Sequence, residues 1–433
     1  MIKNNKFILT ALASLMLTTL TACDDGDTGP QGVAGSDGQN GLAGIQGEAG
    51  VDGINGKDSF KGIEATLVAR AVLNAESPEG AAEIVQYQKS TGYIYAINSS
   101  GDNATVEILD MATASASVLT QNAEQITTNT NLSIMSTIDL SANTQGDANS
   151  IAISDELNIL AVAMAADAID DNGQIAFYDI SGASPIFIKN VEVGVLPDMV
   201  AFSPDSTKVV VANEGEPNGD YSIDPEGSIS IITITDNLIA DTASAITFES
   251  YNSKADELSA QGVMFPSPSG QTINGNTINT TVAMDLEPEY VAISADSKMA
   301  YVSMQENNAL AVIDLATDTL VEIRGLGFKD WSNLMIDASD KDGGINFKQY
   351  NNLYGMYQPD TIATMTWQNA DFIVTANEGD GREYFFDVAD EAACTAANGA
   401  DYDEDDGCLS YTDESRVEDL LLDPVAFANV NND

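Results

Sequence analysis

The chain contains no histidine among its 433 residues. This absence excludes Ser-His-Asp and Cys-His catalytic sites, a histidine general base and a histidine-ligated zinc ion. Oxygen ligands would therefore have to hold any metal ion, and such ligands favour Ca²⁺ or Mg²⁺. Basic residues are also scarce, since 16 Lys and Arg stand against 67 Asp and Glu, for a net charge of −51. Such a surface repels nucleic acid and anionic lipid and attracts divalent cations, although acidic surfaces also serve solubility in salty water.

Only three cysteines occur, and the first follows an export signal. Residues 1–22 begin with lysines and continue into an apolar run shorter than the roughly 20 residues of a dependable membrane span. The Leu-x-Ala-Cys ending at residues 20–23 resembles a bacterial lipobox, so we expect Cys23 to be lipidated after the signal peptide is cleaved. An uncleaved anchor and an ordinary signal peptide are the alternatives. Asp24 resembles the inner-membrane retention signal of some lipoproteins, and we expect a lipid anchor in the cell envelope of a Gram-negative-type bacterium.

The other two cysteines, Cys394 and Cys408, form one pair, and in an oxidising compartment we expect them to be joined by a disulfide. The acidic residues 401–406 between them approach the D-x-D-x-D-G pattern of a calcium loop. The glycine comes one position late, however, and Thr412 stands where the twelfth-position Glu is needed. We therefore interpret this segment as a solvated loop pinned by the disulfide.

Glycine occupies every third position from Gly26 to Gly56, eleven times in register. Unbroken period three is what a collagen triple helix requires, and 33 residues of polyproline II would reach on the order of 100 Å. Only Pro30 supplies an imino acid in this tract. We expect residues 23–58 to be a collagen-like stalk, either a homotrimer or a flexible monomeric spacer.

Beyond the stalk, one unit of short β-prone strands recurs five times. Its second strand is clearest, ends in Asn or Met and lies at residues 95–98, 161–164, 210–213, 301–304 and 374–377. First strands precede these at 84–87, 150–153, 199–202, 290–293 and 361–364, and third strands are expected at 108–111, 177–180, 227–232 and 312–315. A repeated small sheet buries its faces only against neighbouring sheets, so the sequence predicts an all-β protein with a β-propeller, with a β-sandwich as the alternative.

These strands resemble YVTN-type (WD40-like) propeller repeats. The runs at residues 196–200, 211–218 and 221–228 are similar to the choice-of-anchor I family, as are residues 288–292, 375–380, 415–419 and 423–424. The resemblance covers about residues 63–433, and we assign 59–433 to this domain. It implies an exported propeller attached to the cell by a member-specific device, often labelled alkaline phosphatase-like. Because family members normally continue for further blades beyond the position of Asp433, we expect a propeller truncated at its C-terminus.

Two loops follow equivalent second strands and carry paired acids. Glu214 and Glu216 lie in one, and Glu378 and Asp380 in the other, with residues 305–308 in the same place on a third unit. Carboxylates and amide oxygens gathered on one face of the propeller would suit Ca²⁺, and we expect these four acids to bind it and stabilise the domain. Asn-Glu-Gly is also good turn chemistry, so purely structural loops are the alternative.

Two functions remain open. The first is a lipid-anchored binding or scaffold module that offers an acidic, Ca²⁺-loaded face to an extracytoplasmic protein, glycan or phosphoester. The second is a metal-dependent phosphomonoesterase, for which the sequence shows no diagnostic nucleophile and no identifiable catalytic residue. Arg382 and Arg416 would either bind phosphate or pair with nearby acids.

Overall fold

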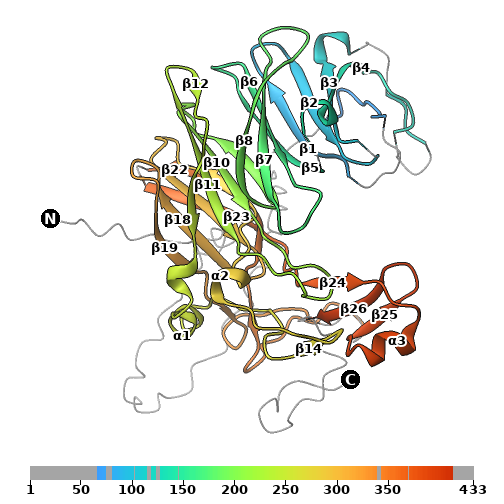
Figure 1. Cartoon of the computed structure of the whole chain (residues 1–433), viewed down its shortest axis with the longest axis vertical. Helices are drawn as coiled ribbons and strands as arrows, with labels where there is room; N and C mark the ends of the chain where they lie inside the picture. The colour runs from blue at the N-terminus through green and yellow to red at the C-terminus, as the bar shows by residue number, and fades with distance from the viewer. Residues whose placement is uncertain are drawn as a thin grey trace, which may run out of the picture. The chain divides into compact units, whose positions relative to one another are not determined.

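The computed structural model describes residues 66–74, 80–101, 103–114, 119–122, 127–144, 146–338, 343–368 and 370–412 (Figure 1). Its strands and helices belong to one of the two compact units into which the chain divides, the unit that contains residues 69–433. The expected signal peptide, the lipidation at Cys23, the stalk and Arg416 lie outside the described residues. In the part of the chain that is described, no helix has the length and apolar character that a membrane crossing requires.

Four antiparallel sheets follow one another along the chain, each built from consecutive strands. The first contains β1 (Ala81–Gln88), β2 (Tyr93–Asn98), β3 (Thr105–Asp110) and β4 (Ile134–Asp139), and the second contains β5 (Ala148–Ser154), β6 (Ile159–Met164), β7 (Asn172–Asp179) and β8 (Ile186–Val195). The third contains β9 (Pro197–Phe202), β10 (Lys208–Asn213) and β11 (Ser228–Thr235), and both β12 (Leu238–Ile239) and β13 (Ser244–Thr247) pair with β11. The fourth contains β16 (Val291–Ile293), β17 (Met299–Met304), β18 (Ala309–Asp314) and β19 (Thr319–Gly325).

Smaller elements complete the described chain. A two-stranded sheet pairs β22 (Pro359–Trp367) with β23 (Ala370–Asn377), and two short hairpins pair β14 (Thr272–Ile273) with β15 (Asn276–Thr277) and β20 (Lys329–Asp330) with β21 (Tyr354–Gly355). A three-stranded sheet, drawn in red in Figure 1, has the order β24 (Glu383–Phe386), β26 (Gly407–Thr412), β25 (Asp401–Asp403). The α-helices are α1 (Ala255–Ser259), α2 (Val282–Asp285) and α3 (Glu391–Ala396), and the 3-10 turns are Met111–Thr113, Leu140–Ala142 and Glu249–Tyr251.

The first strands of successive sheets lie side by side, because β1 contacts β5, β5 contacts β9, β9 contacts β16 and β16 contacts β22. This is how the innermost strands of propeller blades are arranged. The predicted first, second and third strands are all confirmed. The fourth strands were missed in the sequence because they share no common pattern from unit to unit: β8 reads IFIKNVEVGV, whereas β19 reads TLVEIRG.

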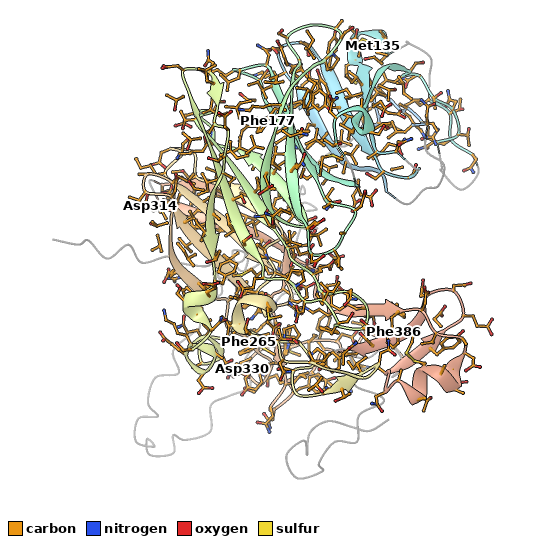
Figure 2. All side chains as sticks on the ribbon, viewed as in Figure 1. Met135, Phe177, Phe265, Asp314, Asp330 and Phe386 are labelled. Atoms are coloured by element: carbon orange, nitrogen blue, oxygen red, sulfur yellow. A yellow bond between two sulfur atoms is a disulfide. The ribbon has the colours of Figure 1, made fainter. Side chains whose placement is uncertain are left out.

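The hydrophobic core lies between the sheets. Alternate residues of β10 serve two different interfaces: Val210 and Ala212 pack in a cluster with the fourth sheet, whereas Val209 and Val211 pack in a cluster with the second. Phe177 of β7 is fully buried in the cluster between the second and third sheets (Figure 2). A strand buried on both faces reads as a continuous apolar run, which is why the second strands were the clearest signal in the sequence.

Cys394 of α3 and Cys408 of β26 form a disulfide, with 5.3 Å between their Cα atoms. The adjoining strand β24 contributes Tyr384 and Phe386 to a small apolar cluster with Tyr221, and Phe386 is labelled in Figure 2. The acidic turn beside the disulfide contains its own hydrogen bond, since Asp403 Oδ1 accepts the backbone N–H of Asp405 at 2.7 Å.

We expect replacement of both cysteines by serine to lower the free energy of unfolding by about 3 kcal/mol, because the bond closes a short loop and restricts the unfolded chain. Urea denaturation of the wild type and the double variant measures this difference. In the native, unreduced protein neither thiol should react with an alkylating reagent. Two reactive thiols would show that the bond does not form.

Candidate functional site

The loop after β10 is fixed by close backbone contacts. The Glu214 N–H donates to the carbonyl of Leu196 at 2.8 Å. Gly215 has a φ of +71°, and a Cβ there would lie 2.9 Å from the backbone of Glu226. A Cβ on Gly227 would lie 2.0 Å from the Leu286 carbonyl oxygen. Gly215 therefore lets the two ends of the loop approach each other, and Gly227 lets the loop contact the segment between α2 and β16, which carries more acids.

Six carboxylates gather around this loop, and we call them the carboxylate cluster. They act on one another electrostatically and come from β9, the loop after β10, the segment before β16 and the turn between β17 and β18: Asp198, Glu214, Glu216, Glu287, Glu289 and Glu306. Apart from Glu287, which is completely buried, each is partly exposed. Segments that lie far apart in the chain thus bring oxygen ligands into one region.

Bulges in the first strands help to aim these acids. The pairing of β9 with β10 passes from Met199↔Ala212 directly to Pro197↔Asn213, so Asp198 is the extra residue of a β-bulge. Asp360 is skipped in the same way where β22 pairs with β23. Asp198 lies within the electrostatic reach of Asp360 and of Glu83 in β1, so acids at the starts of three first strands face one region.

A buried arginine holds one edge of the cluster. Arg382 is 2% exposed, and its Nη1 and Nη2 atoms lie 2.7 Å from Asp285 Oδ1 and from Glu287 Oε2 respectively. Arg382 Nη2 also donates to the Asp285 carbonyl at 2.9 Å. The Tyr384 hydroxyl lies 3.4 Å from both Glu216 Oε1 and Glu287 Oε2. Of the two sequence interpretations of Arg382, the structure supports pairing with acids over phosphate binding.

Two asparagines of the turn after β17 position the cluster. Asn307 is fully buried, and its Oδ1 accepts the Glu287 N–H at 3.1 Å. Its Nδ2 donates to the carbonyls of Asp285 at 2.6 Å and Met264 at 3.1 Å. The neighbouring Asn308 accepts the N–H groups of Tyr357 and Gln358. The turn therefore fixes the backbone on both sides of it.

Burial and mutual repulsion disfavour the charged form of the cluster. Burial, followed by repulsion from Glu216, raises the pKa of Asp198 to about 7. The same two causes raise the pKa of Glu214 well above its usual value. For Glu289, burial and then the charge of Glu306 raise the pKa well above its usual value. Burial and repulsion between neighbouring acids therefore both act against the charged form of these three carboxyls.

The other two predicted ligands, Glu378 and Asp380, are more exposed than the acids of the carboxylate cluster. Glu378 and Asp380 are exposed in the loop after β23. Their backbone is tied to Gln358, which accepts the Glu378 N–H at its carbonyl and donates its Nε2 to the Asp380 carbonyl. The carboxylates that act most strongly on Glu214 are Glu216, Asp198, Glu289 and Glu287, and they do not include this pair. Among the described residues, no group of three or more Cys, Asp or Glu side chains could hold a metal ion as it stands.

Sequence reasoning singled out Glu214, Glu216 and the turn with Glu306, but missed Asp198, Glu287 and Glu289 as members of the site. A signal was available, since an acid directly follows a proline at the start of three first strands. These pairs are Pro197-Asp198, Pro288-Glu289 and Pro359-Asp360. An acid at the same place in three repeats predicts that the acids meet where the first strands lie side by side.

A model of the choice-of-anchor I domain matches residues 83–431. The chain belongs to the choice-of-anchor I family. The family match and the described sheets agree with the fold and the family that the sequence resembles.

This choice-of-anchor I protein is similar over part of its length to a curated cell-surface protein. It is 38% identical over 138 residues to the "Mesenchyme-specific cell surface glycoprotein" of Strongylocentrotus purpuratus, a match that spans 31% of this chain and only 18% of the relative. Among solved structures, it is similar to the β-propeller domain of Cps50 (Swd1) from Myceliophteria thermophila, with 10% identity, 60% and 58% of the two chains covered and a TM-score of 0.34. A putative 6-phosphogluconolactonase from Bacteroides uniformis also has 10% identity and a TM-score of 0.34, with 76% and 68% covered. Likeness at this level carries no argument about function.

Proposed function

We propose that this protein is an exported binding module, tethered to a membrane, whose propeller binds an extracytoplasmic partner in a Ca²⁺-dependent manner. The gathering of loop carboxylates from successive sheets carries this proposal, because it concentrates hard-cation ligands at one region of a propeller. A cation shared between such a surface and an acidic or hydroxyl-rich partner would bridge the two. The cell-surface name of the curated relative is in keeping with a role outside the cytoplasm.

The tether in this proposal is the lipid on Cys23 followed by the stalk of residues 23–58. A stalk on the order of 100 Å long would hold the propeller well clear of lipid headgroups. That separation suits a protein with a net charge of −51, which anionic membranes repel. Trimerisation of the stalk would add avidity by presenting three propellers together.

Binding of the purified protein to intact cells tests this function. Cys23→Ser should release the chain from the membrane fraction and remove the lipid mass, giving soluble protein that can be labelled. We expect saturable binding of this labelled protein to bacterial cells in millimolar Ca²⁺, and its release by a chelator. Unsaturable or chelator-insensitive binding would contradict the proposal, and Ca²⁺-dependent hydrolysis of a chromogenic phosphoester by the same sample would favour the phosphomonoesterase.

A further inference from the structure

We propose that the carboxylate cluster is itself a Ca²⁺ site, with Glu216, Glu287 and Glu306 at its centre and Glu214, Glu289 and Asp198 around them. The proposal rests on the Ca²⁺ dependence proposed above and deepens it, because it keeps Glu214 and Glu216 but replaces the exposed acids after β23 with acids from β9, the segment before β16 and the turn after β17.

One buried oxygen points to a missing ligand. Glu287 is 0% exposed, and its Oε2 is bound by Arg382, whereas its Oε1 has no hydrogen-bond partner in the described part of the molecule. The repulsion that Glu287 experiences comes first from Glu306 and then from Glu216. A fully buried carboxylate oxygen without a donor is costly, and here it lies among further carboxylates.

Glu306 provides a second oxygen of this kind. Its Oε2 is also buried without a hydrogen-bond partner among the described residues. Glu306 is the strongest charged neighbour of both Glu216 and Glu289. Two buried oxygens from different segments therefore lack hydrogen-bond donors and have further acids near them. A bound cation would provide the partner that both oxygens lack.

The charge balance also calls for a cation. Arg382 contributes one positive charge, and that charge is already shared between Asp285 and Glu287. Two charges from a divalent ion would offset the repulsion among the carboxylates that Arg382 does not reach.

The number and type of ligands favour Ca²⁺. Ca²⁺ accepts six to eight oxygens in irregular geometry, whereas Mg²⁺ demands a near-ideal octahedron. Among the residues that the structure describes, no three acids are already placed as ligands, so binding must draw the partly exposed side chains of Glu216 and Glu306 toward Glu287. Backbone and side-chain hydrogen bonds fix the neighbouring chain, since the Glu214 N–H donates to Leu196 and the Asn307 side chain bonds the backbone of Asp285 and Glu287.

Thermal unfolding of the full chain with Cys23→Ser, in chelator and in millimolar Ca²⁺, tests the site. We expect Ca²⁺ to raise the midpoint by about 3 °C or more, as binding to the folded state alone would do at saturating ion. Glu216→Gln with Glu306→Gln should remove most of this shift. Glu378→Gln with Asp380→Asn, a matched loss of two carboxylates, should leave it intact. An equal loss in both double variants, or no shift in the parent protein, would overturn the inference.

Terbium provides a second measurement that does not depend on stability. Excited tyrosine sensitises Tb³⁺ luminescence at short range, and the Tyr384 hydroxyl lies 3.4 Å from Glu216 and Glu287. Tb³⁺ should therefore luminesce on tyrosine excitation and be displaced by Ca²⁺. Tyr384→Phe should reduce the signal severalfold, whereas replacement of the exposed Tyr87 by phenylalanine should not. An undiminished signal in Tyr384→Phe would place the ion elsewhere, even if the double variant failed to fold.

The two proposals fail separately. A normal Ca²⁺ shift together with chelator-insensitive binding to cells would contradict the proposed function and leave the site standing. Chelator-sensitive binding to cells that persists in Glu216→Gln with Glu306→Gln, with the Ca²⁺ shift also retained, would contradict the site alone.

Discussion

Replacement of Arg382 by methionine is expected to lower the free energy of unfolding by about 3–5 kcal/mol, because removing one partner of a buried ion network leaves the others uncompensated. The guanidinium bonds Asp285 and Glu287 at 2.7 Å each, and all three side chains are almost completely buried. Methionine would fill much of the space, so the loss would come from the stranded carboxylates rather than from a cavity. Urea denaturation at neutral pH measures the change.

A surface ion pair provides the control for this prediction. Lys298 Nζ lies 2.6 Å from Asp296 Oδ2, but the two side chains are 71% and 57% exposed. Lys298→Met should change the free energy of unfolding far less than Arg382→Met does, because water screens exposed pairs. If Arg382→Met had no greater effect than Lys298→Met, the buried network would not stabilise the fold. The loss in the free energy of unfolding for Arg382→Lys should lie between those of the two methionine variants. An ammonium group keeps the charge but cannot bond both carboxylates with the geometry of a guanidinium.

The second large effect is expected for Asn307→Ala, at about 3–5 kcal/mol of lost stability. Its side chain makes three hydrogen bonds to the backbone of Glu287, Asp285 and Met264, and alanine would leave these groups, two of them in buried bonds, without that partner. The exposed Asn333, which donates to Asp330 and Ser332, gives a matched change of the same residue type.

The free energy of unfolding of Asn333→Ala should lie within about 0.5 kcal/mol of that of the parent protein, as it does for most surface substitutions. Both variants are compared by the midpoint and slope of urea unfolding. Similar midpoints for the two alanine variants would contradict the role assigned to Asn307. We further expect Asn307→Ala to weaken the Ca²⁺ shift, because Glu287 would lose its fixed backbone position.

The sequence predicted the inner part of each blade well because the packing there is periodic. Strands such as β6, in which every residue is buried, consist of small β-prone residues that recur in each unit. The outer strands depend on local context: β4 follows β3 only after a long connection, and β12 is two residues long. No sequence pattern distinguishes such strands from the loops around them.

The candidate site could be predicted only where it follows the repeat. Glu214, Glu216 and Glu306 come after equivalent strands, so the spacing of the repeats indicates that they share one region. Arg382 and Asp285 are separated by 97 residues in the sequence, and nothing in the spacing selects this partner over the other acids. The burial of Glu287 depends on Asn307 and Gly227, whose contacts appear only in the folded chain.

The two-faced packing of β10 has a consequence for how this protein can change over evolutionary time. Val209 and Val211 must fit one neighbouring blade, and Val210 and Ala212 must fit the other. A larger side chain at any of these positions would require compensating changes in a particular adjacent sheet. Substitutions in β10 should therefore be inherited together with partners in the second or fourth sheet, whereas the outer strands, which face fewer neighbours, are free to diverge independently.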